Sequence, residues 1–114
     1  HLIVVGHSSC GGVKGCDDMC SGAAPELEEK SSFVGRWMDL LRPGYERVKH
    51  LPPAERLGAL EREAVIVSLE NLMTFPFVRA AVEVGEMTLH GLWNDIAGGG
   101  LECYDPATGG FVPI

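Results

Sequence analysis

A histidine and a cysteine three residues apart are the side chains in this sequence best suited to chemistry. They stand in the run HSSCGG as His7 and Cys10, and Gly11 and Gly12 follow them. Zinc prefers imidazole nitrogen and thiolate sulfur as ligands. Two such ligands on a turn leaving a strand can point into one pocket, and glycines allow a sharp turn and close approach of a ligand. From the spacing alone, a buried histidine and a buried cysteine beside a strand are the ordinary alternative.

Two further cysteines could extend this pair. Cys16 and Cys20 are four residues apart and so share one face of a helix. With the His–Cys pair they could form a self-contained structural zinc site. The alternative that we favour is that both are small, half-buried helix residues. We expect Asp17 and Asp18 to solvate the same helix and not to bind metal.

The other polar side chains are interpreted as structural. Glu61, Glu63 and Glu70 lie on a long predicted helix, and we expect most of them to be solvated or paired with Arg56 and Arg62. The sequence shows no Ser/His/Asp arrangement that would indicate a catalytic triad. The glycine-rich turns lack a P-loop lysine at the required spacing.

The elements that must position the His–Cys pair are a strand, a turn and a helix. Leu2 to Val5 is a short apolar, β-branched run, typical of a buried parallel strand. Gly11 and Gly12 then permit a tight turn into a helix over 13–20. In open α/β sheets ligands gather at the carboxyl ends of strands, which is where the pair lies.

Helices are expected through the middle of the chain, over 31–41, 45–49 and 54–73. Ser31 or Ser32 is the candidate N-cap of the first, and Pro43-Gly44 should end it. A short helix follows, with Pro76 in its first turn and Gly85 at its end.

Extended segments close the chain. Strands are expected over 87–95 and 101–104, joined by a glycine turn at 98–100, with a last extended piece at 111–112. The fold class that follows is α/β, with a mainly parallel central sheet flanked by helices and a C-terminal β-hairpin.

Composition limits the class of protein. The 114 residues suit one domain, and 46% hydrophobic residues suit a packed core. A net charge of −7 and a pI near 4.9 argue against binding nucleic acid or an anionic membrane through general attraction. No apolar run approaches the roughly 18 residues that span a bilayer. The clustering of three of the four cysteines favours free thiols in a reducing compartment.

Three segments of the sequence resemble β-class carbonic anhydrases, in that family's order. The resemblance covers nearly the whole chain, and only the stretch 19–53 matches weakly. The three matching segments are 4–13 (VVGHSSCGGV), 63–79 (EAVIVSLENLMTFPFVR) and the late strands, represented by 89–96 (LHGLWNDI) together with Tyr104-Asp105.

The resemblance implies that His7 and Cys10 are ligands of a catalytic Zn²⁺ and that Gly11 and Gly12 shape the substrate pocket. A zinc-bound hydroxide would then hydrate carbon dioxide reversibly to bicarbonate, the activity of a carbonate dehydratase, a zinc lyase. The family's third protein ligand lies in an upstream Cys-x-Asp-x-Arg motif, which this sequence lacks. We therefore expect residues 1–114 to form an N-terminally incomplete domain and the chain alone to be inactive.

The same resemblance implies a homodimer or a higher even oligomer, acting on carbon dioxide and bicarbonate, with no nucleic-acid or membrane partner. We expect a cytoplasmic protein, although an organellar address would have lain upstream of His1. The alternative function is a non-catalytic carbonic anhydrase-like interaction module, or a structural zinc-binding domain.

Overall fold

The chain folds into two compact units, which are described separately. The computed structural model describes residues 1–29 and 32–114. The first unit, here called the sheet unit, comprises residues 1–8 and 65–114. The second, the helical unit, comprises residues 9–64.

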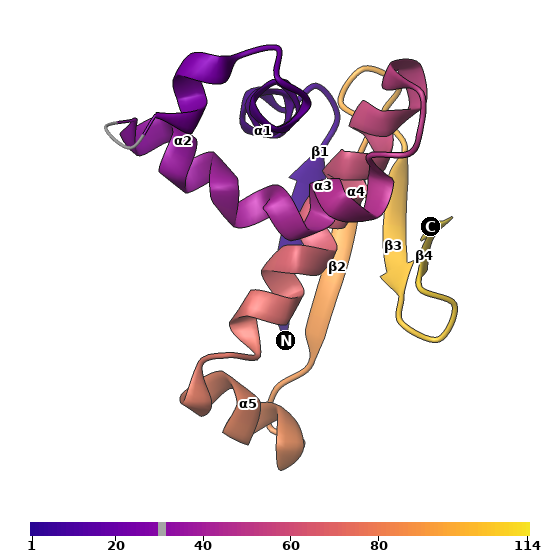
Figure 1. Cartoon of the computed structure of the whole chain (residues 1–114). Coiled ribbons are helices and arrows are strands. Elements are labelled where there is room, and N and C mark those ends of the chain that lie inside the picture. The colour runs from indigo at the N-terminus through magenta and orange to yellow at the C-terminus, as the bar shows by residue number, and fades with distance from the viewer. Residues whose placement is uncertain (30–31) are drawn as a thin grey trace. The chain divides into compact units, whose positions relative to one another are not determined.

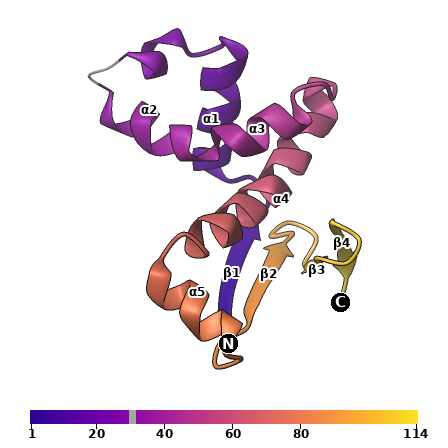
Figure 2. The same cartoon turned by 60° about the horizontal axis from the view of Figure 1, so that its bottom comes forward.

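The sheet unit contains a four-stranded sheet in the order β1-β2-β3-β4. The strands are β1 (Leu2–His7), β2 (Leu89–Asn94), β3 (Leu101–Asp105) and β4 (Gly110–Pro113). β1 and β2 run parallel, in a register that pairs Leu2 with Leu89 and His7 with Asn94. The two pairings that follow are antiparallel. Figure 1 labels the four strands along the chain, and Figure 2 shows β1 and β2 side by side with arrows pointing the same way.

Helical residues pack closely on β2 at a glycine. A Cβ atom placed on Gly91 would lie 2.7 Å from Val65 Cγ1 and 3.0 Å from Leu69 Cδ1. The absence of a side chain at Gly91 therefore lets helix and strand approach each other. Val65, Val67, Val78 and Trp93 are each at most 8% exposed and make the interior of this unit.

The helical unit is built from α1 (Gly11–Ser21), α2 (Phe33–Met38), α3 (Arg42–Val48) and the first part of α4 (Pro53–Leu72). Two short 3₁₀ helices, Pro25–Glu28 and Asp39–Leu41, accompany them. The side chains that form its core are Val13, Cys16, Tyr45, Val48 and Leu60.

α4 continues from the helical unit into the sheet unit, and α5 (Pro76–Glu83) follows it. Among the described residues, no single helix is long and apolar enough to cross a membrane. Only α4 and α5 taken together, across a 90° bend, pass that test of length and composition.

The α/β class and the C-terminal hairpin are confirmed, as are the helices at 54–73 and at Pro76. The helix expected over 31–41 is wrong in its end. α2 stops at Met38, a 3₁₀ turn follows, and Pro43 lies in the first turn of α3 instead of ending a helix. Ser32 is the N-cap of α2, since its hydroxyl accepts a hydrogen bond from the Gly35 N–H at 2.9 Å. Ser31 lies outside the described residues.

Candidate metal centre

His7 is the last residue of β1, and its imidazole is oriented by the backbone. Its Nδ1 lies 2.8 Å from the carbonyl oxygen of Ser8. Because a carbonyl can only accept, Nδ1 carries the proton and Nε2 keeps the lone pair that a metal ion coordinates. Metal-binding histidines usually donate their second ring N–H in this way, which fixes both the tautomer and the ring.

Ser8 ties the end of β1 to the segment that follows β2. Its hydroxyl accepts a hydrogen bond from the Ile96 N–H at 2.9 Å and donates one to Asp95 Oδ1 at 3.3 Å. All of these residues belong to the sheet unit. The carbonyl that orients His7 therefore belongs to a residue that is itself held by two hydrogen bonds.

Cys10, the second residue of the helical unit, is the N-cap of α1. Its backbone is extended, with φ −74° and ψ 120°, and its side chain makes no capping hydrogen bond. It is a half-buried free thiol. The unpaired N–H groups at a helix start favour negative charge, which suits a thiolate. A Cβ atom on Gly12 would lie 3.9 Å from the Cys10 sulfur, and one on Gly11 would have no neighbour within 4 Å.

The sharp turn between these residues occurs at Ser9 and not at the glycines. Ser9 has φ 56°, in the left-handed region, whereas Gly11 and Gly12 already lie in the first turn of α1. The Ser9 N–H donates to Glu61 Oε2 at 2.9 Å, and Glu61 is only 5% exposed. The expectation that Glu61 is solvated or paired with an arginine is therefore wrong.

Helical periodicity could have identified Glu61. It lies four residues after Leu57 and three before Ala64, both of which pack against the core of the helical unit. A carboxylate at that position of α4 faces inward. The sequence could have shown that Glu61 is buried, but not which donor it meets.

Cys16 and Cys20 belong to the core and not to a metal site. Their sulfurs lie 3.9 Å apart, and Cys16 is completely buried. Burial raises the pKa of the Cys16 thiol to about 12 and also raises that of Cys20. A thiol that resists ionisation is a poor zinc ligand. Across residues 1–29 and 32–114, no three His, Cys, Asp or Glu side chains gather as a metal site. The burial and the raised pKa of the Cys16 and Cys20 thiols thus weigh against the four-ligand structural alternative.

Two further acidic residues of the helical unit, Asp17 and Glu63, form ion pairs. Asp17, expected to be solvated, is 8% exposed, and its two carboxylate oxygens accept from Arg56 Nε at 2.6 Å and Nη2 at 3.2 Å. The hydrogen bond to Asp17 raises the pKa of Arg56 above its usual value. Glu63 pairs with Arg47 at 3.1 Å. These carboxylates are therefore structural.

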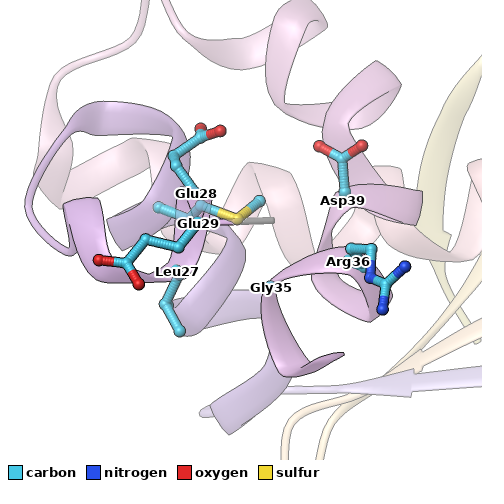
Figure 3. A pocket seen from close by; sticks show the side chains of 7 residues that line it. Leu27, Glu28, Glu29, Gly35, Arg36 and Asp39 are labelled. Carbon is cyan, nitrogen blue, oxygen red and sulfur yellow. The ribbon is translucent and has the colours of Figure 1, made fainter. Parts of the chain in front are cut away.

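A pocket of about 320 Å³ lies in the helical unit, and none of the predicted site residues lines it. It is lined by Met19, Leu27, Glu28, Glu29, Gly35, Arg36 and Asp39. Figure 3 shows the Glu28 and Asp39 carboxylates on two sides of it. Arg42 donates to Glu28 at 2.8 Å and also to Asp39, so both negative charges already have a cationic partner. The pocket gives no support to a second cation site.

Comparison with known proteins defines the class. A family model described as carbonic anhydrase matches residues 1–101. "Beta carbonic anhydrase 3" of Arabidopsis thaliana is 32% identical over 109 residues, which cover 92% of this chain and 41% of that protein. "Carbonic anhydrase 1" of Escherichia coli O157:H7 is 34% identical over 116 residues, covering 99% of this chain and 50% of that protein.

Solved structures agree with the family model. The β-carbonic anhydrase CcaA superposes with a TM-score of 0.81 at 29% identity, over 98% of this chain and 54% of that one. A structure from Sordaria macrospora, described as one of two tetrameric β-carbonic anhydrases, shares the fold with a TM-score of 0.69 at 22% identity, over 90% of this chain and 51% of that one. The fold is thus that of an α/β enzyme family. The chain belongs to the carbonic anhydrases, and within them to the β class. It spans about half the length of the curated relatives that it matches.

Proposed function

We propose that the protein containing this chain catalyses the reversible hydration of carbon dioxide to bicarbonate, with a zinc ion held in part by His7 and Cys10. The observation that carries the proposal is that both side chains have an atom available to bind a metal ion. His7 has its Nδ1 committed to the Ser8 carbonyl, and Cys10 is a free thiol at the start of a helix. Both lie within the residues that match the carbonic anhydrase family model.

The donor set fits zinc, because imidazole nitrogen and thiolate sulfur are its preferred ligands. A bound zinc ion would act as a Lewis acid that makes water nucleophilic near neutral pH. A catalytic zinc needs three protein ligands, and the described residues supply two candidates. The third would come from the upstream Cys-x-Asp-x-Arg motif that the family resemblance implies.

Gly11 and Gly12 would keep the approach to the metal open. Gly11 has no heavy atom near its missing Cβ, and Gly12 lies beside the Cys10 sulfur. A larger residue at Gly12 would occupy space next to the proposed metal-binding thiol and the Trp37 ring, whose Cζ3 would lie 3.7 Å from a Cβ atom at this position. The role of both glycines in the proposal is to leave room for a small substrate.

An even oligomer is part of the proposal. α2 and the turn after it carry apolar side chains that stay exposed: Phe33 is 77% exposed, Trp37 66% and Leu40 58%. Contiguous exposed apolar surface marks contact sites on soluble proteins. The same surface would serve the alternative, a non-catalytic interaction module, so it does not separate the two functions.

Metal content and carbon dioxide hydration separate them. In the complete gene product we expect stoichiometric zinc and rapid hydration in a stopped-flow indicator assay, and in the 114-residue chain alone weak zinc binding and no hydration. Cys10→Ser should abolish zinc binding and activity, whereas Cys103→Ser, a matched change on β3, should preserve both. A complete product that binds zinc without hydrating carbon dioxide would support the interaction module. Full activity of the isolated chain would refute the need for a third ligand.

A further inference from the structure

A serine occupies a backbone conformation that glycine adopts far more easily. Ser9 has φ 56°, and its side chain is exposed. For a residue with a Cβ atom, the left-handed region is sparsely populated and carries a conformational cost. Such a residue persists where its surroundings fix it in place. Because the Ser9 side chain lies at the surface, the group that fixes it must act on the backbone.

That group is the carboxylate of Glu61. Its Oε2 accepts the Ser9 N–H at 2.9 Å, and 5% of the residue is exposed. A buried carboxylate is costly without hydrogen-bond donors, and hydrogen bonds to an ionised acceptor are among the strongest in proteins. The position of Glu61 on the inward face of a 20-residue helix makes it a rigid point of attachment.

Ser9 immediately precedes Cys10, so its φ and ψ set the direction in which the chain enters α1 and presents the thiol. If Ser9 left the left-handed region, the N-cap residue Cys10 would be displaced from the start of the helix. We infer that Glu61 is a positioning residue for the metal centre, which acts by holding Ser9 in the conformation that places Cys10. The part of this inference that concerns the metal rests on the proposed function.

The contact itself can be tested without metal. In the 114-residue chain, the Ser9 amide should be protected from hydrogen exchange. Glu61→Ala should speed its exchange at least about tenfold, and Glu61→Gln, which keeps an oxygen acceptor but not the charge, should give an intermediate rate. Glu55→Ala, an exposed position in the first turn of the same helix, is the matched control and should leave the rate unchanged. Far-UV circular dichroism checks that each variant is folded.

The consequence for the metal is measured in the complete gene product, by competition for Zn²⁺ with a chromophoric chelator. Loss of a group that orients a ligand typically weakens metal binding about 10- to 100-fold, which is the effect expected of Glu61→Ala. Ser9→Gly in the Glu61→Ala background should recover about one decade of affinity, because glycine adopts the left-handed conformation without help. A residue needed only for folding would not be rescued by a glycine at position 9.

Three results would overturn the inference: an unchanged Ser9 exchange rate in Glu61→Ala, an unchanged zinc affinity, or no rescue by Ser9→Gly. A complete gene product that binds no zinc would instead overturn the proposed function. In that case the exchange rate of the Ser9 amide alone decides whether Glu61 holds the turn.

Discussion

The ion pair between Asp17 and Arg56 should be the most sensitive polar contact of the helical unit. It joins α1, which begins beside Cys10, to α4. Two hydrogen bonds of 2.6 and 3.2 Å connect the side chains, which are only 11% and 13% exposed. The Arg56 guanidinium also lies 5.8 Å from the centre of the Tyr45 ring. A change here therefore perturbs a desolvated charge pair and the helix whose N-cap is Cys10, a proposed zinc ligand.

Replacing Arg56 by methionine leaves the Asp17 carboxylate buried without its cation. Removing one partner of a buried pair costs about 3–5 kcal/mol, and lost contact with the Tyr45 ring adds about 0.5–1 kcal/mol. The whole free energy of unfolding of a small domain is about 5–15 kcal/mol. We therefore expect Arg56→Met to remove a large share of the free energy of unfolding, measured by urea denaturation with far-UV circular dichroism as the signal.

A neighbouring ion pair on the same helix provides the control. Lys14 and Asp18 also pair, but their side chains are 56% and 31% exposed, so Lys14→Met should cost less than about 1 kcal/mol. Asp17→Leu combined with Arg56→Met should recover much of the loss, since an apolar pair leaves no buried charge. Equal costs for Arg56→Met and Lys14→Met, or strict additivity in the double variant, would refute the reasoning.

Three further outcomes test the packing, the ionisation and the capping that the structure shows. Gly91→Ala should lower the free energy of unfolding by about 1–3 kcal/mol, because the new Cβ would lie 2.7 Å from Val65 Cγ1. When Gly91→Ala is combined with Val65→Ala, the total cost should be less than the sum of the two single costs. Additive values from urea denaturation would contradict this. In the folded chain the pKa of the Cys16 thiol is raised from 9.0 to about 12. The neutral thiol therefore contributes its full stabilisation below pH 9, and the free energy of unfolding falls by about 4 kcal/mol as the pH rises toward 12, at about 1.4 kcal/mol per pKa unit. Cys16→Ala should flatten this part of the stability–pH curve, and an unchanged slope would count against the raised pKa. Ser32→Ala should cost about 1 kcal/mol by removing the acceptor of the Gly35 N–H, whereas Ser32→Asn should restore most of it in the same assay.

The elements with the strongest periodicity were predictable from sequence. The β-branched run at 2–5 forms β1, and the three- and four-residue spacing of leucines forms α4. Both signals are local, since each follows from the burial of one face of a regular element. The end of the helix expected over 31–41 was not predictable in this way. Pro43 is compatible both with ending a helix and with occupying the first turn of the next, and only packing decides between them.

The identity of the partners of charged residues was also beyond the sequence. Most glutamates of the long helix are predicted to be solvated or paired with Arg56 and Arg62, but Arg56 reaches Asp17, 39 residues earlier. Along one helix, partners three or four residues apart can be predicted from spacing. A partner on another element depends on how the helices pack, which the pattern of charges does not encode.

The turn between His7 and Cys10 shows the same limit at the candidate site itself. The residue types were sufficient to propose His7 and Cys10 as metal donors, because imidazole and thiol chemistry does not depend on the surrounding backbone. The conformation of the turn does depend on it. Local propensity assigns the sharp turn to Gly11 and Gly12, yet Ser9 takes the left-handed conformation, with its N–H bonded to a carboxylate 52 residues away. A non-local hydrogen bond thus outweighs a local preference at the position where a ligand must be placed accurately. The residue that controls this geometry therefore lies on α4, outside the motif that identifies the ligands.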